Sequence, residues 1–405
     1  MSNAHTLTSA PPDTAIGERL EQAGLLLLFG VAAALQFSIA IAQSLLALAV
    51  LCWLALVLLR RERITAPRFF WLLLGYAAWT LVSAAFSPAP RVSLVDSKQL
   101  VLFLLVPLTY RFATAQRAPT LITVVVTAGA ASAALGIVQY GILQYDQLGM
   151  RARGTLGHYM TYSGLLMLVI CMALARILFG RRERAWSALV MPALAVAVIL
   201  TFTRSAVVGG CAAAALLLAL KDLRLVAVLP IAAALLFVAA PAPVAKRFNS
   251  LFNMADAQSR SKDLGARDRM AMLREGEHMI RDHPIVGVGP NMVEVRYGDY
   301  RDPEAVDRIS PHLHNVPVQI AAERGMPALA LWLAFLVTLV VDLARTFRSS
   351  ADPMLPAAAL AAVVAMLAAG LFEYNFGDSE FLMLFLILVT LPFAAARPDL
   401  ARAAE

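Results

Sequence analysis

The feature that most constrains this chain is a series of apolar runs, each long enough to cross a lipid bilayer. A hydrocarbon core of about 30 Å needs about 20 apolar residues in a helix, and such runs recur along almost all of the 405 residues. The chain is 60% hydrophobic and 15% charged, with a mean hydropathy of +0.72. These values exclude a soluble domain with one anchor. They predict an all-α polytopic membrane protein, since helices satisfy their own backbone hydrogen bonds in lipid.

The apolar runs and the polar breaks between them predict about twelve transmembrane helices. The expected ranges are 24–39, 43–59, 69–86, 98–113, 119–144, 159–179, 187–203, 205–220, 224–241, 316–343, 354–372 and 379–396. The first 22 residues lack the order of a signal peptide, so the first helix is expected to be retained. Cys52, Cys171 and Cys211 lie inside apolar runs, which indicates buried thiols rather than disulfides or metal ligands.

The basic residues lie in short turns that fall on one side of this twelve-helix topology. The positive-inside rule therefore places both termini in the cytoplasm, and the net charge of +7 mostly reports this orientation. No nucleic-acid partner is expected, because the basic residues are scattered and have no interleaved aromatic residues.

This topology divides the chain into five parts. They are a cytoplasmic segment at 1–23, transmembrane helices 1–9 at 24–241, a large outer loop at 242–315, helices 10–12 at 316–397 and a cytoplasmic tail at 398–405. A loop of about 70 residues usually has a function. Residues 264–281 have helical spacing, with Met270, Leu273 and Ile280 able to face inward, and predict an amphipathic helix at the membrane surface.

The stretch SPHLHNVPVQIAAERG, residues 310–325, places polar side chains at the start of an apolar run. A helix that begins near residue 315 aligns Asn315, Gln319 and Glu323 on one face over about 12 Å, with His314 at its top. Polar groups at membrane depth predict a functional site. Hydrogen bonding between packed helices is the alternative.

The two histidines of this stretch, His312 and His314, do not predict a metal site, because no third ligand follows in a recognisable spacing. For His312, a surface or structural role fits as well as a catalytic one. The sequence DHPIVGVGPN, residues 282–291, lacks the Gly-Lys-Ser/Thr of a nucleotide-binding loop, which favours a simple turn.

Six arginines share the membrane face of His314 in this topology. They are Arg151 and Arg153 in a shorter outer loop, Arg204 in a tight turn between two apolar runs, and Arg267, Arg269 and Arg274 in the large loop. Guanidinium groups bind diphosphate through two hydrogen bonds without a metal ion. Their number around one histidine predicts an anionic substrate, and contact with lipid headgroups is the alternative.

Four motifs together resemble the O-antigen ligase and polymerase superfamily: HNVPVQIAAERG, REGEHMIRDHPIVGVG, TFTRSA and RARGTLGHYMTYSG. The resemblance covers about residues 150–400, and His314, Asn315 and Gly325 match the spacing of its main motif. Ala328 stands where relatives often have glycine, and Leu273 where many have tryptophan. The resemblance implies a GT-C-like inner-membrane glycosyltransferase that uses undecaprenyl diphosphate-linked glycans at the periplasmic face, without nucleotide, metal or other cofactor.

The resemblance also implies roles for residues. His314 takes the position of the catalytic histidine, and Arg204 and Arg269 take those of the arginines that bind diphosphate. A helix N-terminus disfavours imidazolium, so His314 is expected to be a neutral general base. The residues expected to bind substrate or to support the site are Arg151, Arg153, Arg267, Arg274, His312, Asn315, Gln319 and Glu323.

The expected function is that of an O-antigen ligase, which transfers the glycan from undecaprenyl diphosphate to lipid A-core oligosaccharide. The large loop directly before the histidine motif favours this function over the related O-antigen polymerase. A protein O-oligosaccharyltransferase is a third enzyme candidate, although the chain ends soon after its last helix. A flippase or transporter of lipid-linked glycans is the non-enzyme alternative, and it predicts charged, broken helices near the bilayer midplane instead.

Overall fold

The computed structural model describes residues 12–143, 151–230, 264–306 and 308–397, and within these ranges it consists of helices and short connections without a strand. The helices before the large loop are α1 (Pro12–Ala34), α2 (Ile39–Arg60), α3 (Arg68–Ala85), α4 (Pro90–Asp96), η1 (Ser97–Leu104), α5 (Leu105–Phe112), α6 (Ala118–Val138), η2 (Gln139–Leu143), α7 (Tyr159–Phe179), α8 (Arg184–Leu200), α9 (Arg204–Lys221) and η3 (Leu223–Ala227). The later ones are α13 (Leu264–Asp282), α14 (Met292–Tyr300), α15 (Val316–Ser349), α16 (Met354–Gly370), η5 (Asn375–Gly377) and α17 (Ser379–Ala395).

Seven helical segments within the described ranges are long and apolar enough to cross a membrane, and the shorter helices α8, α16 and α17 are also apolar. The prediction of an all-α polytopic membrane protein is therefore confirmed, whereas the number of twelve spans stays a prediction. The expected helix at 224–241 is described only at its beginning, and its residues 231–241 lie outside the described part of the chain.

Two helices begin earlier than the apolar runs indicated. α1 starts at Pro12, inside the segment expected to precede the first helix, and the span expected at 98–113 starts at Pro90 and is divided into α4, η1 and α5. In each case a proline in the first turn begins a polar helical segment, where its missing N–H costs nothing. Hydropathy finds the apolar centre of a helix but not such a polar start.

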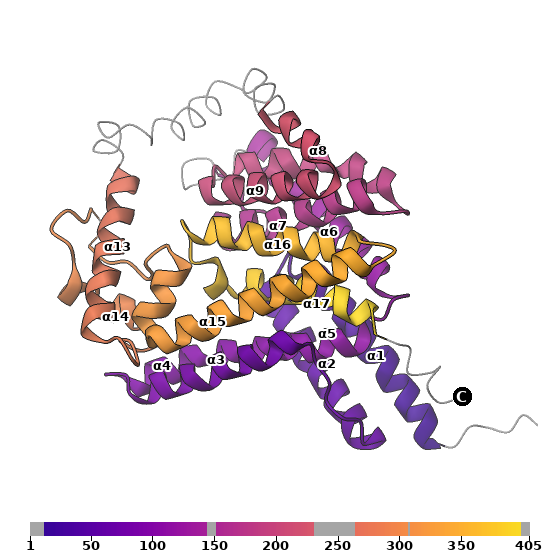
Figure 1. Ribbon diagram of the computed structural model, residues 1–405, viewed down its shortest axis with the longest axis horizontal. Coiled ribbons are helices and arrows are strands. Elements are labelled where there is room, and N and C mark those ends of the chain that lie inside the picture. The colour runs from indigo at the N-terminus through magenta and orange to yellow at the C-terminus, as the bar shows by residue number, and fades with distance from the viewer. Residues whose placement is uncertain (1–11, 144–150, 231–263, 307, 398–405) are drawn as a thin grey trace, which may run out of the picture.

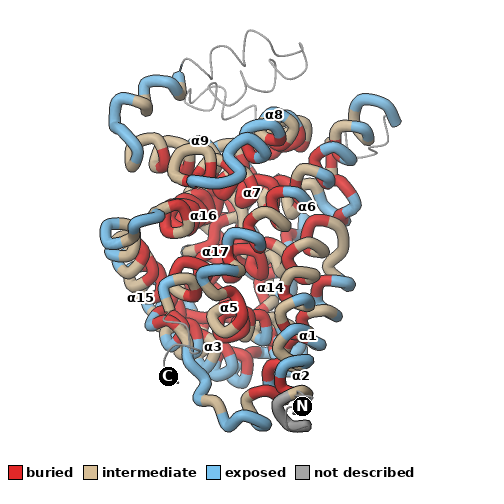
Figure 2. Tube along the Cα trace, turned by 90° about the vertical axis from the view of Figure 1, so that its right-hand side faces the viewer, coloured by how far each residue is buried: buried red, intermediate tan, exposed pale blue. Residues whose placement is uncertain are grey.

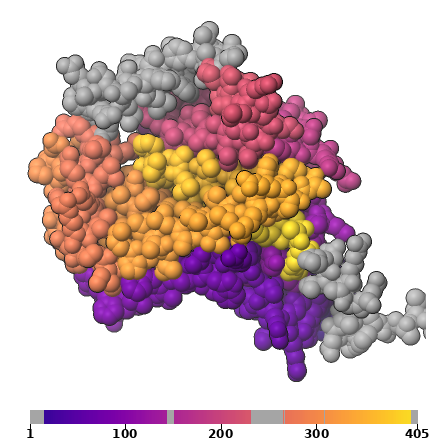
Figure 3. All heavy atoms as spheres, in the orientation of Figure 1, coloured from indigo at the N-terminus to yellow at the C-terminus, as the bar shows by residue number. Residues whose placement is uncertain are grey.

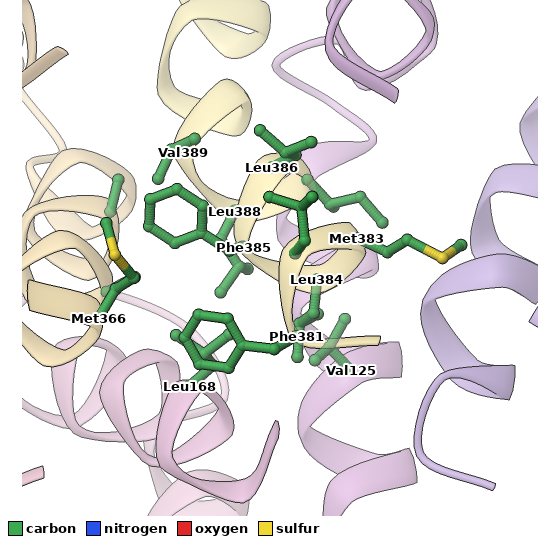
Figure 4. Packing of buried hydrophobic residues seen from close by; sticks show 14 of the residues in the cluster. Val125, Leu168, Met366, Phe381, Met383, Leu384, Phe385, Leu386, Leu388 and Val389 are labelled. Atoms are coloured by element: carbon green, nitrogen blue, oxygen red, sulfur yellow. The ribbon is translucent and has the colours of Figure 1, made fainter. Parts of the chain in front are cut away.

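The helix α17 lies in the interior, and almost all its residues are buried. The buried segments in Figure 2 gather along α7, α16 and α17, and α17 packs against α5, α7 and α16. Figure 4 shows side chains of α17 meeting Val125, Leu168 and Met366 of the surrounding helices. Lipid is as apolar as these side chains, so close packing rather than exclusion from water holds such helices together.

The described part of the large loop forms α13 and α14, which lie at one end of the molecule beside the start of α15 (Figures 1 and 3). Gly276 of α13 has no room for a Cβ against Leu313 and Val318, so the helix packs closely on this start. The predicted amphipathic helix is thus present. Its inward face differs from the prediction, because Met270 is 51% exposed.

The buried face of α13 is formed by Asp268, Met272, Glu275 and Met279, at helical spacing. Asp268 Oδ1 accepts a hydrogen bond from the backbone N–H of Val306, and Glu275 Oε1 accepts one from that of Asp302, at 3.0 and 2.9 Å. Burial raises the pKa of Glu275. Two acids therefore face inward because they satisfy loop backbone, which an apolar pattern does not reveal.

Candidate active site at the start of α15

The helix α15 begins as expected after Asn315, whose Oδ1 accepts a hydrogen bond from Val318 N at 3.0 Å, with Pro317 in the first turn. The preceding residue, His314, has a φ of 48°, in the left-handed region that residues other than glycine rarely adopt. This backbone conformation directs the imidazole toward Glu373 in the connection between α16 and α17. Asn315 Nδ2 donates to Leu371 O of the same connection at 3.1 Å.

Two histidines and one glutamate form the centre of the site. His314 Nδ1 lies 3.4 Å from Glu373 Oε2, and His312 Nε2 lies 4.0 Å from Glu373 Oε1. The two imidazole rings meet edge to face, with centroids 4.2 Å apart. One carboxylate therefore faces both rings.

The ionisation of this centre follows from its burial and its neighbours. Burial, followed by the nearby His314, lowers the pKa of His312 to about 4, so this ring is neutral at pH 7. Burial would raise the pKa of Glu373, but the two histidines, chiefly His314, outweigh this effect, and the pKa lies below its ordinary value. Glu373 is thus an anion beside two imidazoles.

The helix α15 is interrupted at Gly325, and this break explains why glycine occupies positions 287 and 325. Gly325 has φ 79° and ψ 172°, so the expected single helix is two helical pieces joined at this residue. A Cβ on Gly325 would overlap Ile285 O, and a Cβ on Gly287 would overlap the backbone of Glu323. Only glycine permits this close approach of the segment 284–290 to the break.

Backbone groups that the break leaves without a partner in the helix form hydrogen bonds with other segments. The carbonyls of Ala322 and Glu323 accept hydrogen bonds from Val288 N and Gly289 N, both at 2.8 Å. Trp79 Nε1 of α3 donates to Arg324 O at 2.9 Å, and Met326 N donates to Pro284 O at 2.8 Å. The stretch 282–291 is therefore a turn, as predicted, and it docks α13 and α14 on α15.

The polar stripe of α15 faces the protein interior and supports the loops above it. Gln319 Oε1 accepts a hydrogen bond from Leu313 N at 2.7 Å, and Glu323 Oε1 accepts one from Asn291 N at 2.9 Å. Arg324 is 5% exposed and pairs with Glu323 Oε2. Buried polar groups that are paired in this way specify one arrangement.

A cavity of about 320 Å³ opens between α7, α9, α16 and α17, beside His312 and Glu373. Its polar lining residues include His158, Thr161, Ser205 and Asp378, and apolar residues such as Met167 and Phe381 complete the wall. Thr161 Oγ1 donates to Asp378 Oδ2. The mixture of hydroxyl, carboxylate and imidazole groups suits a ligand with several hydroxyl groups.

Two arginines expected from the shorter connections, Arg204 and Arg151, lie next to residues of this cavity wall or to their neighbours. Arg204 is the first residue of α9, and its neighbour Ser205 lines the cavity. The guanidinium of Arg151 lies over the ring of Tyr159, 4.3 Å from its centroid, and Tyr159 in turn stacks on His158 of the cavity wall. Arg153 is half-buried in the same connection.

The three loop arginines differ from one another. Arg274 is held by Asp302 Oδ2 and Glu304 Oε2, both at 2.7 Å, and the hydrogen bond from Arg274 lowers the pKa of Asp302. It therefore stabilises the loop. Arg267 is exposed and Arg269 half-buried in the first turns of α13.

The sequence reasoning missed Glu373, Tyr374, Asp378 and the buried Arg324. The first three belong to the ten-residue polar interruption LFEYNFGDSE, residues 371–380, between the last two apolar runs. The expected topology already placed this interruption on the same membrane face as His314. Its polar residues were the signal that could have found them.

Three donor groups are close enough to share a cation. The nearest donor atoms of His312, His314 and Glu373 all lie within 4.8 Å of one another, and among the described residues they form such a group. Two imidazoles and a carboxylate are a known zinc ligand set. The third group is distant in sequence, which is why spacing did not show it, and the expectation of a metal-independent site stays a prediction.

Comparison with known proteins decides the family. Residues 189–333 match the family model described as O-antigen ligase. This part of the chain belongs to the O-antigen ligase family. Enzymes of this family are glycosyltransferase-like ligases and polymerases. A search of curated proteins found no match.

The O-antigen ligase match contains only part of the site described above, since most residues of the cavity wall lie outside it. It includes Arg204, the large loop, His314 and the break at Gly325, and it ends before Glu373. The family resemblance predicted from the motifs is thereby confirmed. The roles of individual residues stay proposals.

Proposed function

We propose that this chain is an O-antigen ligase of the bacterial inner membrane, multi-pass, with both termini in the cytoplasm and its active site at the periplasmic face. It transfers a glycan from undecaprenyl diphosphate to a hydroxyl group of lipid A-core oligosaccharide. The observation that carries this proposal is that one O-antigen ligase match contains both Arg204 and the strained, half-buried His314.

In the proposed reaction, His314 takes the proton of the acceptor hydroxyl. The acceptor oxygen attacks the anomeric carbon, the bond from that carbon to the diphosphate oxygen breaks, and undecaprenyl diphosphate leaves with the electron pair. A single displacement of this kind inverts the anomeric carbon. General-base assistance is worth about 10²–10⁴ in rate.

Arg204 and Arg269 bind the diphosphate as its charge develops, in place of a divalent cation. Fixed positive charge in a cleft with little water stabilises such a transition state strongly. The other residues of the site stabilise the structure around it. Asn315, Gln319, Glu323 and Arg274 hold loops through the contacts described above, and Arg151 stacks at the cavity wall.

The direct test is transfer by the purified protein, with lipid A-core and undecaprenyl diphosphate-linked glycan and without nucleotide. Wild-type protein should form the joined product in the presence of EDTA, and His314→Ala should not, although it is inserted and folded. Product formation by the His314→Ala protein at the wild-type rate would contradict the proposed base. Loss of activity in EDTA and its recovery on addition of a metal would contradict the arginine-bound diphosphate.

Cells that lack the protein distinguish the related functions. Free lipid A-core with accumulated lipid-linked polymer is the outcome expected for a ligase. A single repeat unit on lipid A-core would indicate a polymerase instead, and an unchanged polysaccharide pattern would indicate neither enzyme.

A further inference from the structure

The connection between α16 and α17 presents Glu373 to His314 through two buried atoms. His314 Nδ1 and Glu373 Oε2 are 3.4 Å apart, and neither atom has a hydrogen-bond partner among the described residues. Burying a polar atom without a hydrogen-bond partner carries a free-energy cost. A small approach that forms the Nδ1–H···Oε2 bond removes this cost for both atoms at once.

Several hydrogen bonds fix the position of this glutamate. Its other oxygen, Oε1, accepts from the N–H of Tyr374 at 3.2 Å. The hydroxyl of Tyr374 accepts from Arg324 Nη1 at 3.3 Å, and Asn375 Nδ2 donates to Met366 O at 3.1 Å. The connection is thus tied both to α15 and to α16.

The histidine is tied to the same connection by its neighbour in the chain. Asn315 uses its two side-chain groups in different directions, since Oδ1 caps α15 and Nδ2 reaches Leu371 O, two residues before Glu373. The separation of imidazole and carboxylate is therefore set by contacts within two residues of each. These hydrogen bonds on both sides indicate that the two side chains are held next to each other by the structure.

This geometry has a clear chemical consequence. An imidazole that donates its Nδ1 proton to a carboxylate is held in one tautomer, with Nε2 as the basic nitrogen. The carboxylate also stabilises the positive charge that the ring gains when it takes a proton. His312 is a poor candidate for the same role, because its Nε2 lies 4.0 Å from the oxygen already engaged by Tyr374 N.

We propose that Glu373 is the positioning residue of His314, holding the imidazole with Nε2 toward the acceptor hydroxyl and stabilising the imidazolium formed during transfer. This inference rests on the proposed function, in which His314 is the base. Glu373 lies outside the residues matched to the O-antigen ligase family.

The test compares Glu373→Gln, Glu373→Asp and the control Glu294→Gln, at an exposed position of α14, in the transfer assay. Glu373→Gln should lower kcat by about 10²–10⁴, as expected when a base loses its orienting carboxylate. The KM for the lipid-linked donor should change by less than about twofold, because no donor contact is lost. Glu373→Asp should recover activity to within about tenfold of wild type, and Glu294→Gln should retain wild-type activity.

The double variant Glu373→Gln with His314→Ala separates positioning from a general structural effect. A residue that acts through His314 has nothing left to act on in the His314→Ala protein, so the double variant should be as active as His314→Ala alone. Thermal unfolding of each purified variant in detergent shows whether it is folded. A further loss in the double variant would overturn the proposal.

Three other outcomes would decide whether Glu373 positions His314 and whether His314 is the base. An unchanged kcat for Glu373→Gln, or a change confined to KM, overturns the positioning role while the proposed function stands if His314→Ala is inactive. Wild-type turnover by His314→Ala removes the proposed base itself. Inactivation of the wild type by a chelator, with recovery on addition of Zn²⁺, assigns the two histidines and Glu373 to a cation. It overturns the positioning role of Glu373 and the general-base role of His314, while transfer itself would still identify the enzyme as a ligase.

Discussion

At the scale of single residues, His314 combines a strained backbone with a reactive side chain. A residue other than glycine in the left-handed region costs about 1–2 kcal/mol, and strain of this kind is kept where the surrounding structure enforces it. Here Asn315 enforces it, since the residue caps α15 and also binds Leu371 O. The conformation places the imidazole against Glu373.

The substitution His314→Gly should therefore separate stability from activity. Glycine adopts the left-handed conformation without strain, so we expect the free energy of unfolding to stay the same or to rise by about 1 kcal/mol, while transfer is abolished. Thermal unfolding in detergent and the transfer assay measure the two effects.

The matched control is Arg61→Gly, since Arg61 also has a left-handed φ, of 50°, at the end of α2 and far along the chain from the site. Its stability should respond in the same way without loss of transfer. A large destabilisation of His314→Gly would show that the imidazole mainly holds the structure together.

The substitution Arg204→Lys tests whether the shape of the positively charged side chain at this position matters. Lysine keeps the charge but offers no planar pair of donors for a diphosphate, so Arg204→Lys should lower transfer by about 10-fold or more, equivalent to one lost charge-assisted hydrogen bond of about 1.5–3 kcal/mol. Initial rates at varied donor concentration measure the effect. Arg224→Lys, just beyond the other end of α9, is the control, and equal rates for both variants would argue against a diphosphate clamp.

At the scale of elements, the helices were easier to predict from sequence than their interruptions. Apolar runs located α2, α3, α6 and α7 within a few residues, because length and hydropathy alone decide a membrane span. The break at Gly325 was not predicted. Its cause is a segment about 40 residues earlier in the chain, which supplies the N–H groups of Val288 and Gly289.

The substitution Gly325→Ala tests this docking. The backbone angles of Gly325 are accessible to glycine alone, and a Cβ at this position would overlap Ile285 O. We expect the segment 284–290 to detach, with a stability loss of at least about 1–3 kcal/mol from backbone strain and a strong loss of transfer. Limited proteolysis of the large loop and thermal unfolding would report it.

The matched control for this docking is Gly298→Ala, in α14 of the same loop, where a new Cβ would meet no atom within 4 Å. Because this glycine is helical, alanine should stabilise by about 0.5–1 kcal/mol. Equal protease resistance of the two variants would mean that the break does not depend on glycine.

At the scale of the whole molecule, side-chain contacts connect turns that are distant in sequence. Arg181 Nη2 donates to Ala351 O at 3.0 Å, and Arg68 Nη1 lies 3.6 Å from Asp342 Oδ1. The basic turns after α2, α7 and α15 thus share the end of the molecule opposite to α13 and α14 (Figure 1). The candidate site could be predicted from sequence only in part. His314 lies in a recognisable motif, whereas Glu373 is distant in sequence and contacts His314 only in the folded chain.

This clustering leads to a prediction about orientation. Turns rich in arginine are retained on the cytoplasmic side, so Arg63 after α2 should face the cytoplasm and Arg267 of α13 the periplasm. Both residues are exposed. In a background without Cys52, Cys171 and Cys211, a membrane-impermeant maleimide should label Arg267→Cys in spheroplasts and Arg63→Cys only after permeabilisation.

The same labelling bears on the chemistry, because the proposed reaction joins the glycan to lipid A-core at the periplasmic face. Labelling of Arg63→Cys in intact spheroplasts, with Arg267→Cys protected, would place His314 and Glu373 on the cytoplasmic side. The proposed acceptor could not then reach the site, whatever the activity of the purified protein. Orientation is therefore a condition for the proposed function that is independent of every substitution in the site itself.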